Sequence, residues 1–191
     1  DWAEREEIGL ILDESFVDFV DGEEGSIVRQ EILDSHLHLC IVKSISKCYG
    51  VPGLRLGIMA SGNTDLISRM KKEAAIWNIN SFAEFYMQIM EKYKRDYAIS
   101  LEKVRLERKK FINELEKIPH LHPIRSQANF VMVELTGEIT AGWITRELLV
   151  KHGLLIKDLS GKISQGQYIR LAVRNTEDNE KLISALKQEL M

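Results

Sequence analysis

The sequence predicts an α/β fold with a mostly parallel sheet and a second, smaller α/β domain. Residues 8–12 form an unbroken apolar run, which is typical of a strand that lies inside a parallel sheet. Residues 82–89 and 182–190 carry apolar side chains at helical spacing, so helices are expected to pack against the strands. With 191 residues and 45% apolar content, the chain is long enough to bury a core.

The amino-terminal part of the sequence is expected to form the main sheet. Residues 8–12 are predicted to be a strand buried on both faces, and residues 26–35 a helix that covers the sheet. Residues 37–42 and 56–60 are two further strands, and Lys43 between them is expected to be solvated. The loop between these strands is short. It therefore allows an antiparallel pair, because a parallel crossover needs about a dozen residues or more.

Two helices are predicted after this sheet. Asn63 or Thr64 is expected to cap the first, over residues 65–75, and Ser81 to cap the second. The second helix carries apolar side chains at positions i, i+3, i+4 and i+7, which places them on one face. The residues expected on that buried face are Phe82, Phe85, Tyr86 and Ile89.

A long helix over residues 97–115 is predicted to connect two domains, with the basic run of residues 105–110 on its solvated face. Pro119 ends this helix, because proline has no backbone N–H to donate. The rest of the chain is expected to form a small α/β domain. Its predicted strands are residues 130–135, 154–156 and 168–173, and its predicted helices are residues 143–152, closed by Gly153, and a last helix capped by Asn175 or Thr176.

Composition excludes several classes of function. The formal net charge of −3 provides no basic surface for nucleic acid and no polybasic segment for a membrane. The two cysteines, Cys40 and Cys48, imply neither a disulfide framework nor a metal cluster, which favours a reducing, cytoplasmic location. No apolar run approaches the roughly 20 residues of a membrane span.

The segment of residues 44–57 concentrates the groups that carry chemistry. Ser44 and Ser46 supply hydroxyls, the glycines free the backbone to donate to an anion, and Arg55 adds a guanidinium. Lys47 lies among these donors. A lysine amine beside a bound phosphate is the arrangement that pyridoxal phosphate (PLP) chemistry requires. The alternative is a serine- and glycine-rich surface turn with a solvated lysine.

This segment closely resembles the lysine loop of fold-type I PLP enzymes of the aminotransferase class I/II group, in particular the histidinol-phosphate aminotransferases and threonine-phosphate decarboxylases. The shared pattern is Ser44-x-Ser46-Lys47, Gly50 and Gly53-Leu54-Arg55-x-Gly57. The resemblance covers essentially the whole chain. It implies that Lys47 binds the PLP aldehyde covalently and acts as the catalytic acid and base, and that Ser44, Ser46 and Arg55 bind the PLP phosphate.

The resemblance also implies a domain organisation. Residues 1–95 would be the carboxyl-terminal part of a three-layer α/β/α PLP-binding large domain, residues 96–118 a linking helix, and residues 119–191 the small carboxyl-terminal α/β domain. The chain would then be the carboxyl-terminal portion of an enzyme nearly twice as long that forms a homodimer. These 191 residues alone are expected to bind PLP weakly and to be inactive.

Asp13 directly follows the first predicted strand, where ligands of open α/β sheets bind. The resemblance assigns it the contact with the PLP pyridine nitrogen, which its negative charge keeps protonated. The alternative is an aspartate that caps a helix. Phe16 departs from the aminotransferases, which usually carry a tyrosine there that donates to the ring oxygen, whereas relatives similar to the decarboxylase tolerate phenylalanine.

The resemblance assigns substrate binding to the small domain. Asn129 matches the asparagine that faces the substrate, with a strand-edge turn residue as the alternative. Arg170 matches the arginine that binds the substrate carboxylate in a bidentate manner. Lys157 stands where the phosphate-specific aminotransferase carries an arginine. Arg174 replaces the usual glycine, and contacts an anionic substrate or is simply exposed. Trp77 lines the substrate cleft or lies in the core.

Three functions remain open from the sequence. The first is a PLP-dependent aminotransferase that acts on a small amino substrate bearing a phosphate or carboxylate. The second is a PLP lyase similar to threonine-phosphate decarboxylase, which Phe16, the Trp77 segment and Arg174 favour. The third is a non-catalytic fragment or a domain of a longer fused protein. Neither a metal, a nucleic acid nor a membrane partner is expected.

Overall fold

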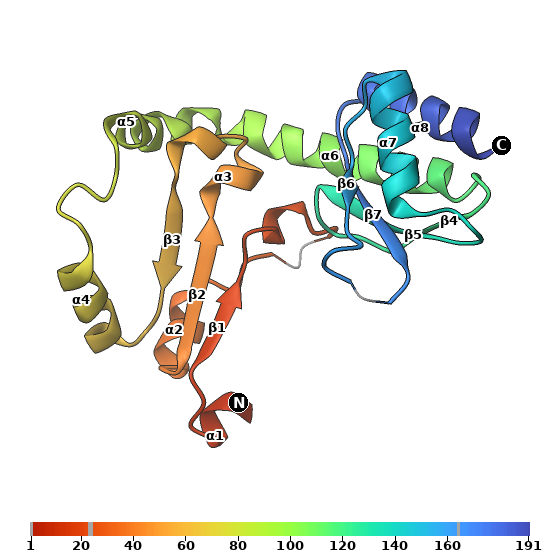
Figure 1. Cartoon of the computed structure of the whole chain (residues 1–191). Helices are drawn as coiled ribbons and strands as arrows, with labels where there is room; N and C mark the ends of the chain where they lie inside the picture. The colour runs from red at the N-terminus through yellow and green to blue at the C-terminus, as the bar shows by residue number, and fades with distance from the viewer. Residues whose placement is uncertain (1, 23–24, 164) are drawn as a thin grey trace. The chain divides into compact units, whose positions relative to one another are not determined.

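The computed structural model describes residues 2–22, 25–163 and 165–191. The chain divides into two compact units, Asp1–Leu101 and Glu102–Met191. Helix α6 (Lys94–Leu115) contributes residues to both units (Figure 1). Since the boundary falls inside this helix, the predicted division into a large-domain part, a linking helix and a small domain stays a prediction.

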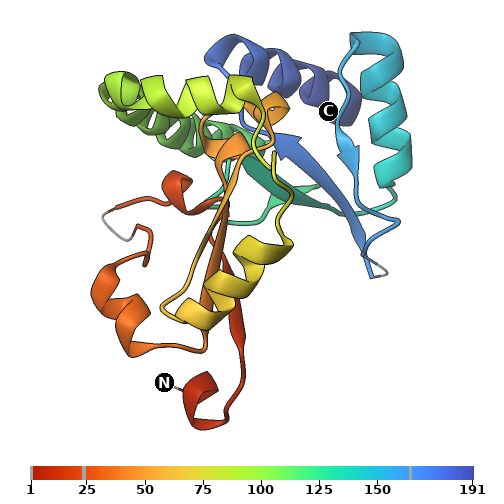
Figure 2. The ribbon, with the colours of Figure 1, turned by 90° about the vertical axis from the view of Figure 1, so that its left-hand side faces the viewer.

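The first unit is built on a three-stranded sheet. Its strands β1 (Leu10–Asp13), β2 (Leu39–Ser44) and β3 (Gly57–Ala60) are arranged in the order β1-β2-β3 and run side by side (Figure 1; Figure 2). β1 and β2 are parallel, and β2 and β3 are antiparallel. The antiparallel pair follows from the short connection between β2 and β3. The carboxyl ends of β1 and β2 therefore meet at one edge of the sheet.

The prediction that the first strand is buried on both faces is wrong. Leu10, Ile11 and Leu12 are 46%, 70% and 37% exposed. β1 is an edge strand that pairs with β2 alone in this sheet. Much of its surface is therefore not covered by the described residues. In the central strand, by contrast, Leu39 and Ile41 are buried. The apolar run therefore predicted the strand correctly but did not predict how far its side chains are buried.

Short helices connect and flank these strands. Asn63 caps α4 by accepting a hydrogen bond from the backbone N–H of Leu66 at 2.9 Å. Asn80, rather than the predicted Ser81, caps α5. The helices of this unit are α1 (Trp2–Arg5), α2 (Gln30–Ser35), α3 (Ile45–Cys48), α4 (Thr64–Glu73) and α5 (Ser81–Ile89), with single 3-10 turns η1 (Val17–Phe19), η2 (Pro52–Leu54) and η3 (Met90–Tyr93).

The buried face of α5 agrees with the prediction only in part, since Tyr86 packs against Ile45 and Leu56 as expected but two of the predicted residues do not. Phe82 and Phe85 are 80% and 60% exposed, whereas Ala83 is fully buried against Ile45 and Leu56. The helical period was correct, but the contact is made by the Ala83 side of the helix, because a small side chain allows the lysine-bearing turn to approach closely. The alternative that Trp77 lies in a core is also wrong, since this side chain is 93% exposed.

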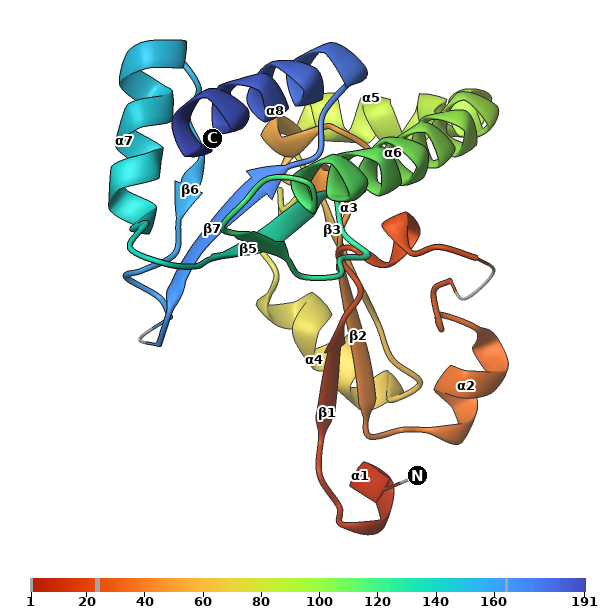
Figure 3. The same cartoon turned by 90° about the vertical axis from the view of Figure 1, so that its right-hand side faces the viewer.

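The second unit is an antiparallel sheet covered on one face by helices (Figure 3). Strands β5 (Phe130–Leu135) and β7 (Gln167–Ala172) form its centre, between β4 (Leu121–Pro123) and β6 (Lys157–Asp158). The helices are α7 (Ala141–His152), α8 (Thr176–Leu190) and the second half of α6. The sequence missed β4, which has only three residues. The strand predicted over residues 154–156 is instead β6, because Gly153 and Leu154 donate hydrogen bonds back to the end of α7.

Alternation along β5 and β7 separates a core face from an exposed face. Val131 and Val133 of β5 and Ile169 and Leu171 of β7 are fully buried against the helices. Arg170, between the last two, therefore points to the opposite face and is exposed. The strands predicted over residues 130–135 and 168–173 and the caps of the two helices in this unit are confirmed, with Gly153 ending α7 at φ 65° and Asn175 capping α8.

Arg108 is an exception to the predicted solvated face of α6. Its side chain is 1% exposed, and its Nη1 donates hydrogen bonds to the carbonyl oxygens of Gln127 and Ala128 at 2.9 and 3.0 Å. The loop before β5 has no regular strand partners at these carbonyls, so a buried guanidinium satisfies them. Arg108 thus fixes the loop that ends at Asn129, one of the residues expected to bind substrate.

Replacing Arg108 with methionine is expected to lower the free energy of unfolding by about 1.5–3 kcal/mol, because two carbonyls lose a charged donor. Urea unfolding followed by circular dichroism measures this change. Lys103→Met is the matched control, since Lys103 is exposed on the same helix. Equal losses for the two variants would show that the Arg108 hydrogen bonds contribute no stability of their own.

Candidate active site at the strand ends

The carboxyl ends of β1 and β2 bring the predicted cofactor residues to one edge of the sheet. Asp13 is the last residue of β1 and pairs in register with Val42 of β2. Ser44 ends β2, and Lys47 follows in the single-turn helix α3. The parallel pairing therefore places Asp13 beside the segment that carries Lys47. This edge is where open α/β sheets bind ligands.

Asp13 is held as a carboxylate by its neighbour Ser15. The backbone N–H of Ser15 donates to Asp13 Oδ1 at 2.8 Å, and the Ser15 hydroxyl accepts from the backbone N–H of Ser44 at 3.0 Å. Hydrogen bonds from Ser15 hold the pKa of Asp13 below its usual value, and the charge of Lys47 lowers this pKa further. An ionised carboxylate is the form that would keep a pyridine nitrogen protonated.

Lys47 is presented to solvent by a turn whose other side is packed. Ile45 and Ser46 are buried, and Ile45 contacts Leu56 and Ala83, while Lys47 is exposed. The Lys47 Nζ lies 4.3 Å from the centre of the Phe16 ring. An ammonium group at this distance is attracted to the face of the ring. Phe16, where aminotransferases usually carry tyrosine, thus faces the lysine directly.

The three predicted phosphate-binding residues lie in neighbouring segments but differ in environment. Ser44 is half-buried and Ser46 is 6% exposed. Ser44 pairs with Gly57 of β3, two residues after Arg55. Arg55 is exposed, its Nη1 donates to the carbonyl oxygen of Pro52 at 3.0 Å, and its φ of 56° lies in the left-handed region, which is rare for a residue with a side chain. The backbone segments that carry Ser44, Ser46 and Arg55 therefore lie close together. The Arg55 side chain, however, donates its hydrogen bond within its own loop.

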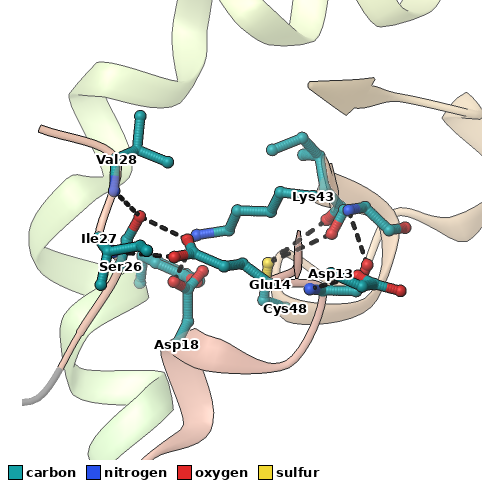
Figure 4. Close-up of polar contacts among 12 residues, drawn as sticks. Asp13, Glu14, Asp18, Ser26, Ile27, Val28, Lys43 and Cys48 are labelled. Carbon is teal, nitrogen blue, oxygen red and sulfur yellow. Dashed lines mark hydrogen bonds and ion pairs between the residues drawn. The ribbon is translucent and has the colours of Figure 1, made fainter. Parts of the chain in front are cut away.

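A partly buried network of charged and aromatic residues near the lysine-bearing turn was not found from the sequence. Lys43, which was expected to be solvated, forms an ion pair with Asp18 at 2.5 Å and is 17% exposed (Figure 4). The hydroxyl of Tyr97 donates to Asp18 Oδ2 at 2.6 Å, and the Tyr97 ring stacks on Tyr49 with centroids 4.0 Å apart. The Lys43 prediction is wrong because its partner lies 25 residues away in sequence, so no local pattern shows it.

The same network includes the thiol of Cys48, the residue after Lys47. Burial raises the pKa of Cys48, and a hydrogen bond with Asp18 raises it further. A thiol with a raised pKa is a poor nucleophile, so Cys48 contributes packing and hydrogen bonding here rather than reactivity. Burial also acts to raise the pKa of Asp18, but hydrogen bonds from Lys43, Tyr97 and Cys48 outweigh it and lower the pKa overall.

The Asp18 ion pair predicts a pH-dependent contribution to stability. Because the pKa of Asp18 is lowered in the folded state, its contribution is present above the unfolded pKa of about 3.9 and is lost as the pH falls through the folded value. Asp18→Asn is expected to lower the free energy of unfolding by about 1–3 kcal/mol at pH 7, and by less as the pH falls below about 4. Urea unfolding at a series of pH values measures this dependence, with Asp65→Asn as an exposed control. A loss for Asp18→Asn that stays constant with pH would contradict the assignment.

The predicted substrate residues lie in the second unit, on the exposed face of its sheet. Lys157 of β6 pairs directly with Arg170 of β7. Both line a cavity of about 730 Å³ at this end of the sheet. The Arg170 guanidinium carbon lies 5.1 Å from the centre of the Phe130 ring, which supports its planar group. The backbone carbonyl oxygen of Asn129 accepts a hydrogen bond from the backbone N–H of Val173 at 2.9 Å. Asn129 is not among the residues that line this cavity.

The described residues contain no group of histidine, cysteine or acidic side chains arranged for a metal ion. Cys40 and Cys48 are both free thiols. Among the same residues, no helix combines the length and apolar character that crossing a membrane would need.

Comparison with known proteins places this architecture among the fold-type I PLP enzymes. The histidinol-phosphate aminotransferase of Clostridium acetobutylicum superimposes with a TM-score of 0.88 at 29% identity, over 98% of this chain and 56% of that one. The family model "Aminotransferase class I and II" matches residues 1–186. The chain therefore belongs to the aminotransferase class I and II family, whose cofactor is PLP.

Two relatives indicate the range of chemistry in this family. The CMP-5'-(3-aminopropyl)phosphonate synthase of Streptomyces rubellomurinus is 37% identical over 94% of this chain and 28% of its own length. The L-serine phosphate decarboxylase of Sulfurospirillum multivorans is 31% identical over 95% of this chain and 47% of its own length. The chain thus spans about half the length of the relatives it matches, or less. These matches do not confirm the expectation that it corresponds to their carboxyl-terminal portion.

The residues of the first unit fit PLP. An exposed lysine amine stands at a strand end, within electrostatic reach of an ionised aspartate. The turn after Lys47 is open, because Gly50 has a φ of 67° and a methyl group added to it would meet no atom within 4 Å. This turn, with the Ser44 and Ser46 hydroxyls, leaves space and donors for a phosphate.

Proposed function

We propose that the protein containing this chain is a PLP-dependent decarboxylase of a small phosphorylated amino acid. The observation that carries the choice of reaction is Phe16, whose ring faces the Lys47 amine at 4.3 Å and offers no hydroxyl. Similarity to the L-serine phosphate decarboxylase supports the same choice. PLP supplies an electron sink for the bond that breaks at the substrate α-carbon.

The proposed roles of this chain's residues follow from their chemistry. Lys47 would hold the cofactor through its amine, which a bound amino substrate would free. Lys47 is then a free amine whose protonated form, held against the Phe16 ring, can deliver a proton to the substrate α-carbon after carbon dioxide leaves. Asp13, ionised and bound by Ser15, keeps the proton on the ring nitrogen. Ser44, Ser46 and Arg55 bind the PLP phosphate.

Substrate recognition is proposed for the second unit. The Arg170 guanidinium offers paired donors that match a carboxylate, and Lys157 adds a charge beside it. Asn129 is proposed to donate a further hydrogen bond to the substrate from the loop that Arg108 fixes. The homodimer and the cytoplasmic location stay predictions.

Transamination, the first expectation from the sequence, is the second candidate. The histidinol-phosphate aminotransferase resembles this chain in fold at least as closely as the solved decarboxylase of Sulfurospirillum multivorans, with TM-scores of 0.88 and 0.84. For this reaction Lys47 would first accept the substrate α-proton as a base and then donate a proton as an acid. The residues that bind the cofactor and the substrate would be the same.

One assay separates the two reactions. The full-length protein loaded with PLP is incubated with O-phospho-L-serine or O-phospho-L-threonine, with and without 2-oxoglutarate. Release of carbon dioxide that does not depend on 2-oxoglutarate is expected. Glutamate formation without release of carbon dioxide would show that the protein catalyses transamination and not decarboxylation. If these substrates gave neither product and the protein did not bind PLP, the proposed function would be wrong.

A further inference from the structure

The cavity in the second unit carries a third cation beyond the two predicted there. Arg174, which follows β7, lines the same cavity as Lys157 and Arg170. From the sequence, this residue was either a contact for an anionic substrate or simply exposed. The structure shows that it is exposed and also placed at the cavity wall, so the two alternatives do not exclude each other.

The backbone of Arg174 is fixed by a buried side chain. Asn179 is 6% exposed, its Oδ1 accepts from the Arg174 backbone N–H at 2.9 Å, and its Nδ2 donates to the Arg174 carbonyl oxygen at 2.9 Å. Asn175 caps helix α8 immediately afterwards. The Cα of Arg174 is therefore held in place at the edge of the cavity. Only its side chain is left to adjust to a ligand.

The Arg174 side chain is paired with a carboxylate that a ligand can replace. Its Nε donates to Asp178 Oδ2 at 2.7 Å, with the two side chains 68% and 38% exposed. Exposed ion pairs of this kind contribute about 0–1 kcal/mol. The bond uses Nε and leaves the Nη groups without a partner in the part of the chain that the structure describes. Asp178 therefore occupies a position that a stronger anion could take.

The charges around the cavity favour a ligand with more than one negative group. Lys157 and Arg170 lie side by side in β6 and β7, and the carboxylate next to them in the cavity is Asp158, whose pKa the charge of Lys157 helps to lower. Asp158 also lines the cavity, but its Oδ1 accepts from the backbone N–H of Ser160 at 2.7 Å. A substrate carboxylate is matched by Arg170 alone. Two further cations suit a phosphate or phosphonate, which carries about −1.5 to −2 charges near pH 7.

We propose that Arg174 determines substrate specificity by binding, with Lys157, the phosphate or phosphonate group of a substrate whose carboxylate lies on Arg170. Asp178 holds the Arg174 guanidinium in the absence of substrate and exchanges it for the phosphoryl oxygens on binding. This inference rests on the proposed function, because it assumes that the cavity takes the amino substrate. It adds the residue that distinguishes a phosphorylated amino acid from its unphosphorylated form.

The test measures binding rather than turnover. The full-length protein, labelled with ¹⁵N, is titrated with O-phospho-L-serine, L-serine and inorganic phosphate, and the arginine Nε–H signals are followed by NMR. The Arg174 signal is assigned by its loss in Arg174→Gln. O-phospho-L-serine is expected to bind the wild-type chain at least about 10-fold more tightly than L-serine, which corresponds to about 1.4 kcal/mol.

Variants separate the contribution of Arg174 from general charge. Arg174→Gln is expected to weaken O-phospho-L-serine binding about 10-fold and to change L-serine binding less than about twofold. Asp178→Asn is expected to tighten O-phospho-L-serine binding, because the competing carboxylate is gone. Arg146→Gln is the matched control, since Arg146 is exposed on α7 and does not line the cavity.

The outcomes are distinct from those that test the proposed function. Equal affinities of the wild-type chain for O-phospho-L-serine and L-serine, or equal effects of Arg174→Gln on both, would overturn the specificity proposed for Arg174. So would equal losses in Arg174→Gln and Arg146→Gln, which would show only a general effect of charge. Binding of inorganic phosphate that moves the Arg174 signal supports the proposal. Failure of the full-length protein to bind PLP contradicts the proposed function instead.

Discussion

Replacing Lys47 with alanine is expected to abolish covalent PLP binding and to lower turnover of the full-length protein by at least about 10²–10⁴-fold. This amine is proposed both to bind the PLP aldehyde and to move the proton at the substrate α-carbon, and positioned acid–base groups contribute that much on their own. The loss is measured as the disappearance of the visible absorption band of bound PLP and as the rate of carbon dioxide release. Among the variants proposed for this chain, Lys47→Ala has the largest expected effect.

Two controls separate the loss of this amine from a general effect. Lys47→Arg keeps a positive charge beside the Phe16 ring but cannot bind an aldehyde, so it is expected to be as inactive as Lys47→Ala. Lys71→Ala removes an exposed lysine in the last turn of α4 and is expected to leave the band and the rate unchanged. Retained turnover in Lys47→Ala would remove Lys47 from the mechanism.

Replacing Asp13 with asparagine is expected to lower kcat by about 10²–10³-fold while the cofactor remains bound. The asparagine oxygen still accepts from the backbone N–H of Ser15, so the turn is preserved, but the negative charge that keeps the ring nitrogen protonated is lost. Removing one electrostatic contact to a reacting group has effects of this size. The measurement is kcat together with the absorption band, which should persist because Lys47 is intact.

The pH dependence of turnover gives a second check on Asp13. Its pKa is lowered, so the carboxylate is ionised throughout the neutral range and its contribution is lost only as the pH falls through this lowered value. Asp96→Asn, on the exposed first turn of α6, is a matched control that should not change kcat. Full activity of Asp13→Asn would exclude a contact between this carboxylate and the ring nitrogen.

The chemistry of the candidate site could be predicted because its residues are contiguous. Residues 44–57 carry the lysine, the hydroxyls and the glycines within one loop, so their types and spacing appear directly in the sequence. The antiparallel pairing of β2 and β3 followed from the short connection between them. The caps of α4 and α8 were also predictable, since an asparagine and the N–H it accepts from are only three residues apart.

Predictions of burial failed where neighbours decide which face of an element is covered. The apolar run before Asp13 forms a strand but lies at an edge, and α5 buries Ala83 instead of Phe82 and Phe85. Periodicity fixes which residues share a face of a helix, but not which face another segment covers. That choice depends on packing against residues far away in the sequence.

The sequence by itself determined the family, the cofactor and the lysine loop, because these depend on residue types at short spacing. Only the tertiary structure decided which charged groups are paired or gathered: Lys43 with Asp18, buried Arg108 with the carbonyls before Asn129, and Arg174 in one cavity with Lys157 and Arg170. Most of these contacts join segments that are distant in the chain. A charged side chain becomes buried only when folding supplies its partner, so no local pattern shows the pair.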